Sequence, residues 1–208
     1  MSKTDYSLYL VTDSNIRSRD QMEEWVRQAI LGGVTLVQLR EKHISTREFY
    51  QAAVSMKEVT QRYHVPLIIN DRLDIALAAE ADGLHIGQSD LPAGMTKRLL
   101  GEGKILGLSA GNLAEAKKAE EDGADYVGVG AVFPTSTKAD AVYVTKETLR
   151  EIKSLLSIPV VAIGGINKRN MEQLYGSGID GVAVVSAIMG SDDPKGAAHE
   201  LKGMTCRL

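Results

Sequence analysis

Two acidic residues each follow a short apolar segment in the middle of the chain. Asp71 comes directly after Leu67–Asn70, and Asp90 comes shortly after Gly83–Ile86. A short helical pattern from Leu73 to Ala81 separates the two segments, which should therefore be parallel neighbouring strands. Both carboxylates then lie at the same end of a sheet, where oxygen ligands suit a divalent cation that holds a phosphorylated ligand. The spacing thus predicts a metal and phosphate site at these two strand ends.

Each acid also has a simpler interpretation. Asp71 and Asp90 stand just before expected helices, where an acidic residue commonly caps the helix N-terminus. Taken singly, each is more typical of a cap than of a metal ligand. Their occurrence on adjacent strand ends, with the amide of Asn70 beside them, favours the metal site.

Positively charged residues follow the expected strand Thr35–Arg40. Alternate residues of an extended chain face the same side, so Gln38, Arg40 and Lys42 share one side and Leu39 faces the other. Two cations and an amide could then converge on one anionic ligand. The alternative is a charged loop that simply faces solvent.

Hydroxyl groups and a lysine follow strands later in the chain. Ser109 ends one expected strand and offers a hydroxyl donor, which by itself is a weak signal. After the strand Tyr126–Val129 come Thr135, Thr137 and Lys138. This combination is typical of an anion-binding loop with a charged end.

The last two expected strands run into small residues. Pro159–Ile163 is followed by Gly165, and Gly181–Val184 is followed by Val185 and Ser186. In phosphate-binding barrels, the loops after the last two strands hold a phosphate through backbone N–H groups. The alternative is that the glycine only allows close packing of a helix and a strand.

The fold follows from an alternation of short apolar runs and longer amphipathic stretches, repeated about eight times. Most of the runs are continuously apolar, as in strands covered on both faces. This predicts an α/β fold, a single-domain (β/α)8 TIM barrel over residues 1–208. An open doubly wound sheet is the alternative, although the first strand lacks a glycine-rich dinucleotide turn. The expected strands are Tyr9–Thr12, Thr35–Arg40, Leu67–Asn70, Gly83–Ile86, Lys104–Ser109, Tyr126–Val129, Pro159–Ile163 and Gly181–Val184. The expected helices include Met22–Leu31, Arg47–Tyr63, Leu113–Asp122, Lys146–Leu156 and Lys168–Tyr175.

Composition excludes several classes of protein. The formal net charge is -3, which argues against nucleic acid as a partner. No run approaches the roughly 18 apolar residues of a membrane span, so we expect no membrane partner and a cytoplasmic location. The single cysteine, Cys206, allows neither an intramolecular disulfide nor a cysteine-based metal cluster.

These motifs together resemble the thiamine-phosphate synthase family. The resemblance runs from Leu8 to about Met189 and rests on QLREK, NDR, ADGLHIGQSDLP, GLSA, GADYVGVGAVFPTSTK, VVAIGGI and GVAVVSAI. It implies a (β/α)8 barrel and a pyrimidinylmethyl transferase. In that reaction hydroxymethylpyrimidine diphosphate loses pyrophosphate, and the nitrogen of thiazole phosphate attacks the methylene carbon. The partners would be these two small molecules, with a homodimer as an open question.

The resemblance also implies roles for individual residues. Mg²⁺ would bridge the diphosphate and the carboxylates of Asp71 and Asp90. The cationic contacts to the diphosphate would be Arg40, Lys42 and Lys138, with Ser109 as a hydroxyl donor. Gln38 and Asn70 would lie near the pyrimidine or its diphosphate. Thiazole phosphate would be held by Thr135, Thr137, Gly165, Val185 and Ser186.

Three other functions compete with this interpretation. A thiazole tautomerase, similar to this family, uses a histidine near the end of the fifth strand, where Ser109 is followed by Ala110-Gly111-Asn112. A non-catalytic barrel that binds thiazole phosphate would not need both aspartates. A sugar-phosphate epimerase or isomerase would want an acid and base pair instead. We expect His85 to lie inside the barrel, and no histidine to be placed to activate Ser109.

Overall fold

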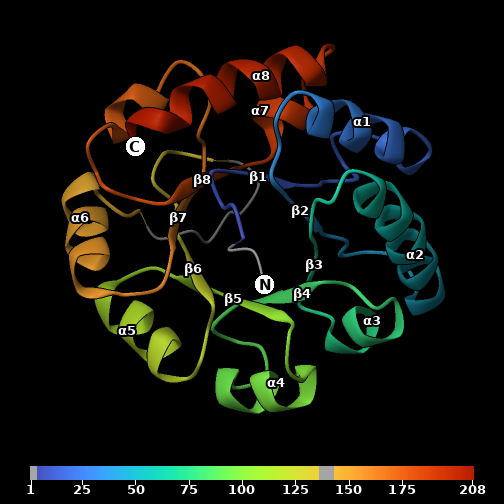
Figure 1. The fold of residues 1–208 in the computed structure, drawn as a ribbon, viewed down its shortest axis with the longest axis horizontal. Coiled ribbons are helices and arrows are strands. Elements are labelled where there is room, and N and C mark those ends of the chain that lie inside the picture. The colour runs from blue at the N-terminus through green and yellow to red at the C-terminus, as the bar shows by residue number, and fades with distance from the viewer. Residues whose placement is uncertain (1–3, 136–142) are drawn as a thin grey trace.

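Eight parallel strands form a closed barrel in the order β1 to β8, and β1 also pairs with β8. The structure is a computed structural model that describes residues 4–135 and 143–208. Helices surround the strands as a ring (Figure 1). The predicted (β/α)8 barrel is confirmed, and the open doubly wound sheet is wrong because the first and last strands are hydrogen-bonded neighbours.

The strands agree with the sequence prediction to within one residue at either end. Their ends matter for the site, because Thr12 and Arg40 lie just beyond β1 and β2 and not inside them. The strands are β1 (Leu8–Val11), β2 (Leu36–Leu39), β3 (Leu67–Asn70), β4 (Gly83–Ile86), β5 (Ile105–Ala110), β6 (Tyr126–Val129), β7 (Val160–Ile163) and β8 (Gly181–Val184).

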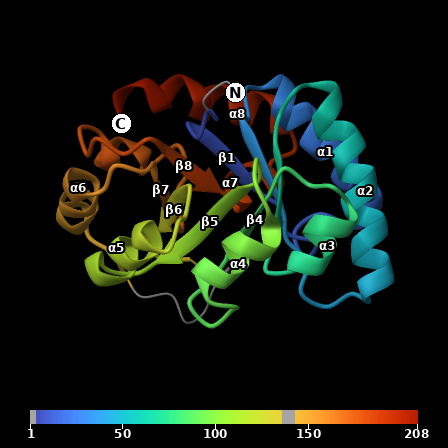
Figure 2. The same cartoon turned by 60° about the horizontal axis from the view of Figure 1, so that its bottom comes forward.

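The helices lie outside the strands, with α1 and α2 along one flank and α5 and α6 along the other (Figure 2). The last long helix, α8, packs against α1 and so completes the ring (Figure 1). Within the described part of the chain, none of the helices has the length and apolar character needed to cross a bilayer. The helices are α1 (Arg19–Leu31), α2 (Thr46–Arg62), α3 (Leu73–Ala78), α4 (Ala93–Leu100), α5 (Leu113–Glu121), α6 (Lys146–Leu155), α7 (Ser186–Met189) and α8 (Pro194–Met204), with 3₁₀ turns η1 (Met171–Leu174) and η2 (Thr205–Arg207).

The helix expected over Lys168–Tyr175 is wrong, since only the short turn η1 forms there. Two asparagine side chains explain the difference. The Nδ2 groups of Asn167 and Asn170 donate to the Gly165 carbonyl at 3.0 and 2.9 Å. Asparagine side chains that bond nearby backbone groups compete with the helical hydrogen bonds. The segment therefore folds around Gly165 and does not continue as an α-helix.

The core has two parts, one inside the barrel and one between the strands and the helices. Alternation along β2 separates them, because Leu39 joins the outer layer while the Gln38 side chain points into the interior. The interior layer contains Tyr6, Tyr9, Val11, Leu36, Ile68, Tyr126, Val161 and Ala183.

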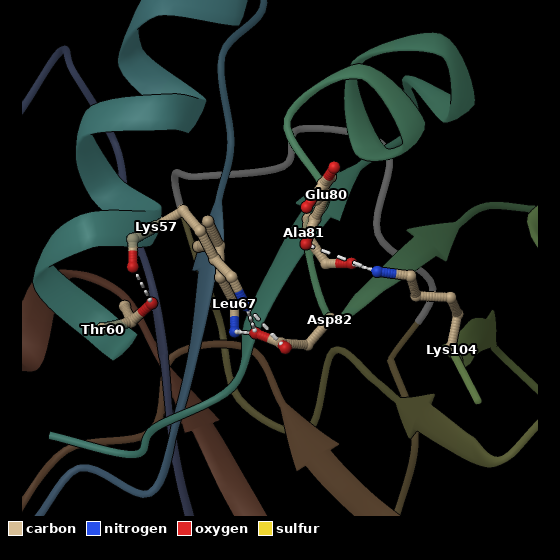
Figure 3. Close-up of polar contacts among 7 residues, drawn as sticks. All are labelled: Lys57, Thr60, Leu67, Glu80, Ala81, Asp82 and Lys104. Carbon is tan, nitrogen blue, oxygen red and sulfur yellow. Dashed lines mark hydrogen bonds and ion pairs between the residues drawn. The ribbon is translucent and has the colours of Figure 1, made fainter. Parts of the chain in front are cut away.

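The end of the barrel where the strands begin carries a repeated ion pair. Asp82 stands just before β4, and its Oδ2 accepts a hydrogen bond of 2.7 Å from the backbone N–H of Leu67 at the start of β3 (Figure 3). The same carboxylate pairs with Nζ of Lys57 on α2 at 2.6 Å. Lys104 adds a bond of 2.6 Å from its Nζ to the Ala81 carbonyl. One carboxylate thus joins two strands and a helix.

The same arrangement recurs at two further positions around the barrel. Asp125 precedes β6 and accepts from the Leu106 N–H at 2.7 Å. Asp180 precedes β8 and accepts from the Val160 N–H at 2.8 Å. Their lysine partners, on α4 and α6, are Lys97 and Lys153. The spacing from strand to strand is therefore held by carboxylates at the end of the barrel away from the predicted site.

We expect Asp82→Ala to lower the free energy of unfolding by about 2 kcal/mol, because the Leu67 N–H loses its acceptor. Lys57→Met is the matched control, since it keeps that acceptor and removes only a partly exposed ion pair, worth below about 1 kcal/mol. Urea denaturation of both variants measures the difference. Equal losses of unfolding free energy in the two variants would show that the bond from Asp82 to the Leu67 N–H is not the main stabilising contact of Asp82.

Candidate active site

The two acids lie at the carboxyl ends of adjacent parallel strands, β3 and β4. The backbone N–H of Asp71 donates to the His85 carbonyl at 2.8 Å, and Oδ2 of Asp71 forms an ion pair with the Lys42 ammonium. Oδ2 of Asp90 accepts from the Gly87 N–H at 2.7 Å within its own loop. Neither acid caps the helix that follows, because α3 and α4 begin without a side-chain cap. The simpler helix-cap interpretation therefore fails for both.

The donor set suits Mg²⁺ bound together with a phosphorylated ligand. Among the described residues, no group of three or more His, Cys, Asp or Glu side chains gathers as a ready-made metal cage. Mg²⁺ commonly binds through one or two carboxylates and completes its shell with substrate phosphate and water. Asp71 also has a φ of 61°, a left-handed conformation that is uncommon outside glycine and is found at functional sites.

The end of β2 supplies the positive charge. Lys42 reaches Asp71, as described above, while the Arg40 guanidinium makes no hydrogen bond or ion pair with any other described residue. The backbone N–H of Arg40 donates to Thr12 Oγ1 at 3.1 Å. One cation is thus already directed at an acid of the site, and a second remains available for an anion. Asn70 is buried, and within residues 4–135 and 143–208 its side chain has no hydrogen-bond partner.

A chain of polar side chains crosses the barrel interior. Gln38 Nε2 donates to the Tyr9 hydroxyl at 2.7 Å, and the hydroxyls of Tyr9 and Tyr126 are 2.8 Å apart. The Tyr126 hydroxyl and His85 Nδ1 share a bond of 2.9 Å. His85 Nε2 and Ser109 Oγ are also 2.9 Å apart. Two residues of the expected site, Gln38 and the hydroxyl donor Ser109, are therefore linked through three buried side chains.

The expectation that no histidine would be placed to activate Ser109 is wrong. His85 does lie inside the barrel, as expected, but its ring reaches Ser109 from the neighbouring strand. Gly107 makes this possible, because a Cβ at that position would lie 2.1 Å from the Tyr126 ring. The missing side chain lets Tyr126 enter the interior and hold the other ring nitrogen. A signal was present in the sequence, since Gly107 and Ser109 alternate on one face of the strand.

Tyr9 and Tyr126, the two tyrosines of this hydrogen-bonded series, were not singled out from the sequence. Burial raises the pKa of the Tyr9 phenol above its ordinary value, and burial likewise raises the pKa of Tyr126. Both hydroxyls therefore stay protonated at neutral pH and act as neutral hydrogen-bonding groups. They hold the His85 ring in one orientation and do not supply charge to the site.

The loops after β6 and β7 are hydrogen-bonded to each other, across the barrel mouth from the ends of β2 and β3. The Phe133 N–H donates to the Gly164 carbonyl at 3.1 Å. Gly165 has a φ of 66°, and a Cβ there would lie 2.4 Å from the Pro134 carbonyl oxygen. Only glycine fits this approach, which brings Gly165 close to the segment that leads to Thr135. Thr137 and Lys138 lie outside the described residues.

Val185 and Ser186 follow β8, the strand next to β7 in the barrel. Ser186 is exposed and begins α7, which is only 4 residues long. The structure therefore brings the described candidates to one end of the barrel in two groups. The first group is Gln38, Arg40, Lys42, Asn70, Asp71, Asp90 and Ser109. The second group is Thr135, Gly165, Val185 and Ser186.

We expect Tyr126→Phe to lower the free energy of unfolding by about 1–3 kcal/mol, because Tyr9 and His85 both lose a buried hydrogen-bond partner. Tyr6→Phe is the control, since the Tyr6 ring packs 5.0 Å from Tyr126 but its hydroxyl is outside the polar chain. Urea denaturation measures stability, and the ¹⁵N chemical shifts of His85 report its ring protonation. Unchanged shifts in Tyr126→Phe would argue against a positioned His85 ring.

Comparison with known proteins agrees with this geometry. The family model described as thiamine monophosphate synthase matches residues 8–188. Thiamine-phosphate synthase of Ruminiclostridium cellulolyticum is 58% identical over 200 residues, covering 96% of this chain and 95% of that protein. The Clostridium botulinum thiamine-phosphate synthase is 57% identical over 201 residues, covering 97% and 94%.

A solved structure shows the same likeness in three dimensions. Thiamine phosphate pyrophosphorylase from Pyrococcus furiosus superimposes with a TM-score of 0.90 at 40% sequence identity, covering 97% of this chain and 96% of that chain. Because the match spans the whole barrel and all of its strand ends, the chain belongs to the thiamine monophosphate synthase family.

Proposed function

We propose that this protein joins hydroxymethylpyrimidine diphosphate to thiazole phosphate, releasing pyrophosphate and forming thiamine phosphate. One observation carries the proposal: Asp71 and the cation Lys42 meet at the same barrel end as Asp90, in a chain of the thiamine monophosphate synthase family. A diphosphate with a bound metal needs both signs of charge in one place. The cytoplasmic location and the homodimer stay predictions.

The diphosphate end of the proposed site uses the first group of residues. Asp71 and Asp90 would hold Mg²⁺, which when bound neutralises part of the charge on the diphosphate. Arg40 would bind phosphate oxygens directly, because its guanidinium is unpaired among the described residues and suits bidentate contacts. The Lys42 ammonium would contact both Asp71 and the ligand. Lys138 would contribute a third cation.

The proposed substitution is dissociative. The electrons of the C–O bond leave with the pyrophosphate, and the aminopyrimidine carries the positive charge that develops at its methylene carbon. The lone pair of the thiazole nitrogen then forms the new C–N bond. Groups already arranged around the departing charge stabilise it most effectively, and no protein nucleophile is required.

The remaining residues would orient the two substrates. Gln38 and Asn70 are candidates for the pyrimidine or its diphosphate, with Ser109 as a hydroxyl donor. The hydrogen bonds through Tyr126 link Gln38 to Ser109. Thiazole phosphate would lie between the loops after β6, β7 and β8. Its contacts would be Thr135, Thr137, Gly165, Val185 and Ser186.

The tautomerase alternative gains one observation, the contact between His85 and Ser109. Two features weigh against it. His85 is only 9% exposed, and each of its ring nitrogens already has a hydrogen-bond partner inside the barrel. A proton shuttle needs a ring nitrogen that reaches the substrate. A tautomerase would rearrange a thiazole without releasing pyrophosphate, which separates the two functions by assay.

We expect pyrophosphate release only when both substrates and Mg²⁺ are present together. Continuous detection of pyrophosphate, with each substrate omitted in turn, measures this. Chelation of the metal with EDTA should abolish the release, and added Mg²⁺ should restore it. A protein that binds thiazole phosphate but never releases pyrophosphate would support the non-catalytic alternative.

Asp71→Ala and Lys138→Ala should each lower kcat by about 10²-fold or more. Asp71→Ala removes a carboxylate that would hold Mg²⁺, and Lys138→Ala removes a positive charge that would stabilise the departing diphosphate. Asp122→Ala and Lys118→Ala are matched controls, as these two residues form an ion pair with each other at the end of α5, away from the site. Steady-state kinetics at saturating Mg²⁺, with thermal melts to verify folding, provide the comparison. Near-normal rates in either site variant would contradict these roles.

A further inference from the structure

The loop between β1 and α1, residues 12–18, touches both halves of the proposed site. No residue of this loop is among the candidates for substrate or metal binding. It nevertheless contacts the residues after β2 on one side and the residues after β8 on the other. Those two neighbours carry the diphosphate contacts and the thiazole phosphate contacts of the proposed function.

On the β2 side, two hydroxyls hold the cationic segment. Thr12 is fully buried, and its Oγ1 accepts from the Arg40 N–H at 3.1 Å. Ser14 Oγ donates to Glu41 Oε2 at 2.8 Å. Glu41 is 8% exposed, and its carboxylate forms no ion pair with the more exposed Arg40 or Lys42. The Ser14 contact thus holds the side chain of the residue that stands between the two cations.

On the β8 side, Arg17 holds the end of α7. Its Nε donates to the Met189 carbonyl at 3.3 Å, and its Nη2 donates to the Ser191 carbonyl at 3.4 Å. The guanidinium lies over the Trp25 ring, 3.9 Å from its centre. Trp25 Nε1 donates to the same Ser191 carbonyl at 3.3 Å. A cation suits helix-end carbonyls that lack partners, and stacking on an aromatic ring fixes the plane of the guanidinium.

The loop between these two ends is itself tied into a compact turn. Asp13 is buried, and its Oδ1 accepts from the N–H and the side-chain amide of Asn15, both at 2.9 Å. Its carbonyl accepts from the N–H groups of Ile16 and Arg17 at 3.1 and 3.2 Å. Four hydrogen bonds to Asp13 thus close the middle of the loop, and each end makes its own contacts.

We propose that the β1–α1 loop is a brace that positions the two anion subsites independently, through Ser14 at the diphosphate side and Arg17 at the thiazole phosphate side. This inference rests on the proposed function. Both are positioning residues, because each acts through a neighbour and touches no substrate. Arg17 sets the place of the segment that begins with Val185 and Ser186, and Ser14 sets the segment from Arg40 to Lys42.

The test crosses two variants with two ligands. Arg17→Ala should weaken thiazole phosphate binding about tenfold, as expected for lost bonds from a charged group, and change pyrophosphate binding less than about twofold. Ser14→Ala should weaken pyrophosphate binding about threefold and change thiazole phosphate binding less. Isothermal titration with thiazole phosphate alone and with pyrophosphate plus Mg²⁺ gives the dissociation constants without any turnover. The KM values for the two substrates should follow the same crossed pattern.

Two milder variants keep the test decisive if Arg17→Ala fails to fold. Arg17→Lys keeps the charge but loses the planar fork, and Trp25→Phe keeps a ring but loses the indole donor. Each should weaken the binding of thiazole phosphate and not that of pyrophosphate, by a smaller factor than Arg17→Ala does. Trp25 is the only tryptophan, so its fluorescence in Arg17→Lys reports the same site during titration.

Equal effects on both ligands, or none on either, would overturn the brace. The failure of the proposed function has a different signature. A wild-type protein that binds both ligands but releases no pyrophosphate would refute the synthase activity while leaving the crossed binding result to decide the brace. A wild-type protein that binds neither ligand would refute both.

Discussion

Every strand of this barrel must point the same way, because each is joined to the next by a crossover that returns the chain to the starting end. Closure through the β1–β8 pair then leaves no free sheet edge, so all of the strand ends meet around one mouth. Residues far apart in the chain, such as Lys42 and Asp71, become neighbours for this reason alone. The charge distribution of the candidate site is a consequence of that one topological constraint.

Closure also creates an interior that side chains must fill. Most of it is apolar, but Gln38, Tyr9, Tyr126, His85 and Ser109 carry polar atoms through it. Buried polar groups without partners are costly, whereas a fully connected chain of hydrogen bonds makes the arrangement specific. The interior thus couples the end of β2 to the end of β5 with little freedom in between.

The two ends of the barrel have different roles: one joins the strands, and the other carries the candidate ligand contacts. Where the strands begin, Asp82, Asp125 and Asp180 each join neighbouring strands to a helix. Where the strands end, the loops carry the candidate ligand contacts, and the loop after β1 contacts the segments after β2 and β8. Because the carboxylates that hold the strands lie at the far end, substitutions in the loops can alter binding while the sheet stays intact.

The sequence by itself determined the barrel and the residue types at its strand ends. Apolar periodicity and the chemistry of a residue that follows a strand are local properties, so they can be read without coordinates. The placement of Asp71 after a strand, of Arg40 at the end of a strand, and of Gln38 and Leu39 on opposite faces needed nothing more.

Tertiary structure decided the contacts between strand ends. His85 meets Ser109 only because the β4–β5 register and the missing side chain of Gly107 admit Tyr126 beside them. The expected helix after β7 gave way because Asn167 and Asn170 bind the Gly165 carbonyl. Such contacts depend on which neighbours a closed sheet brings together and on how much space they leave, and neither property is local in the chain.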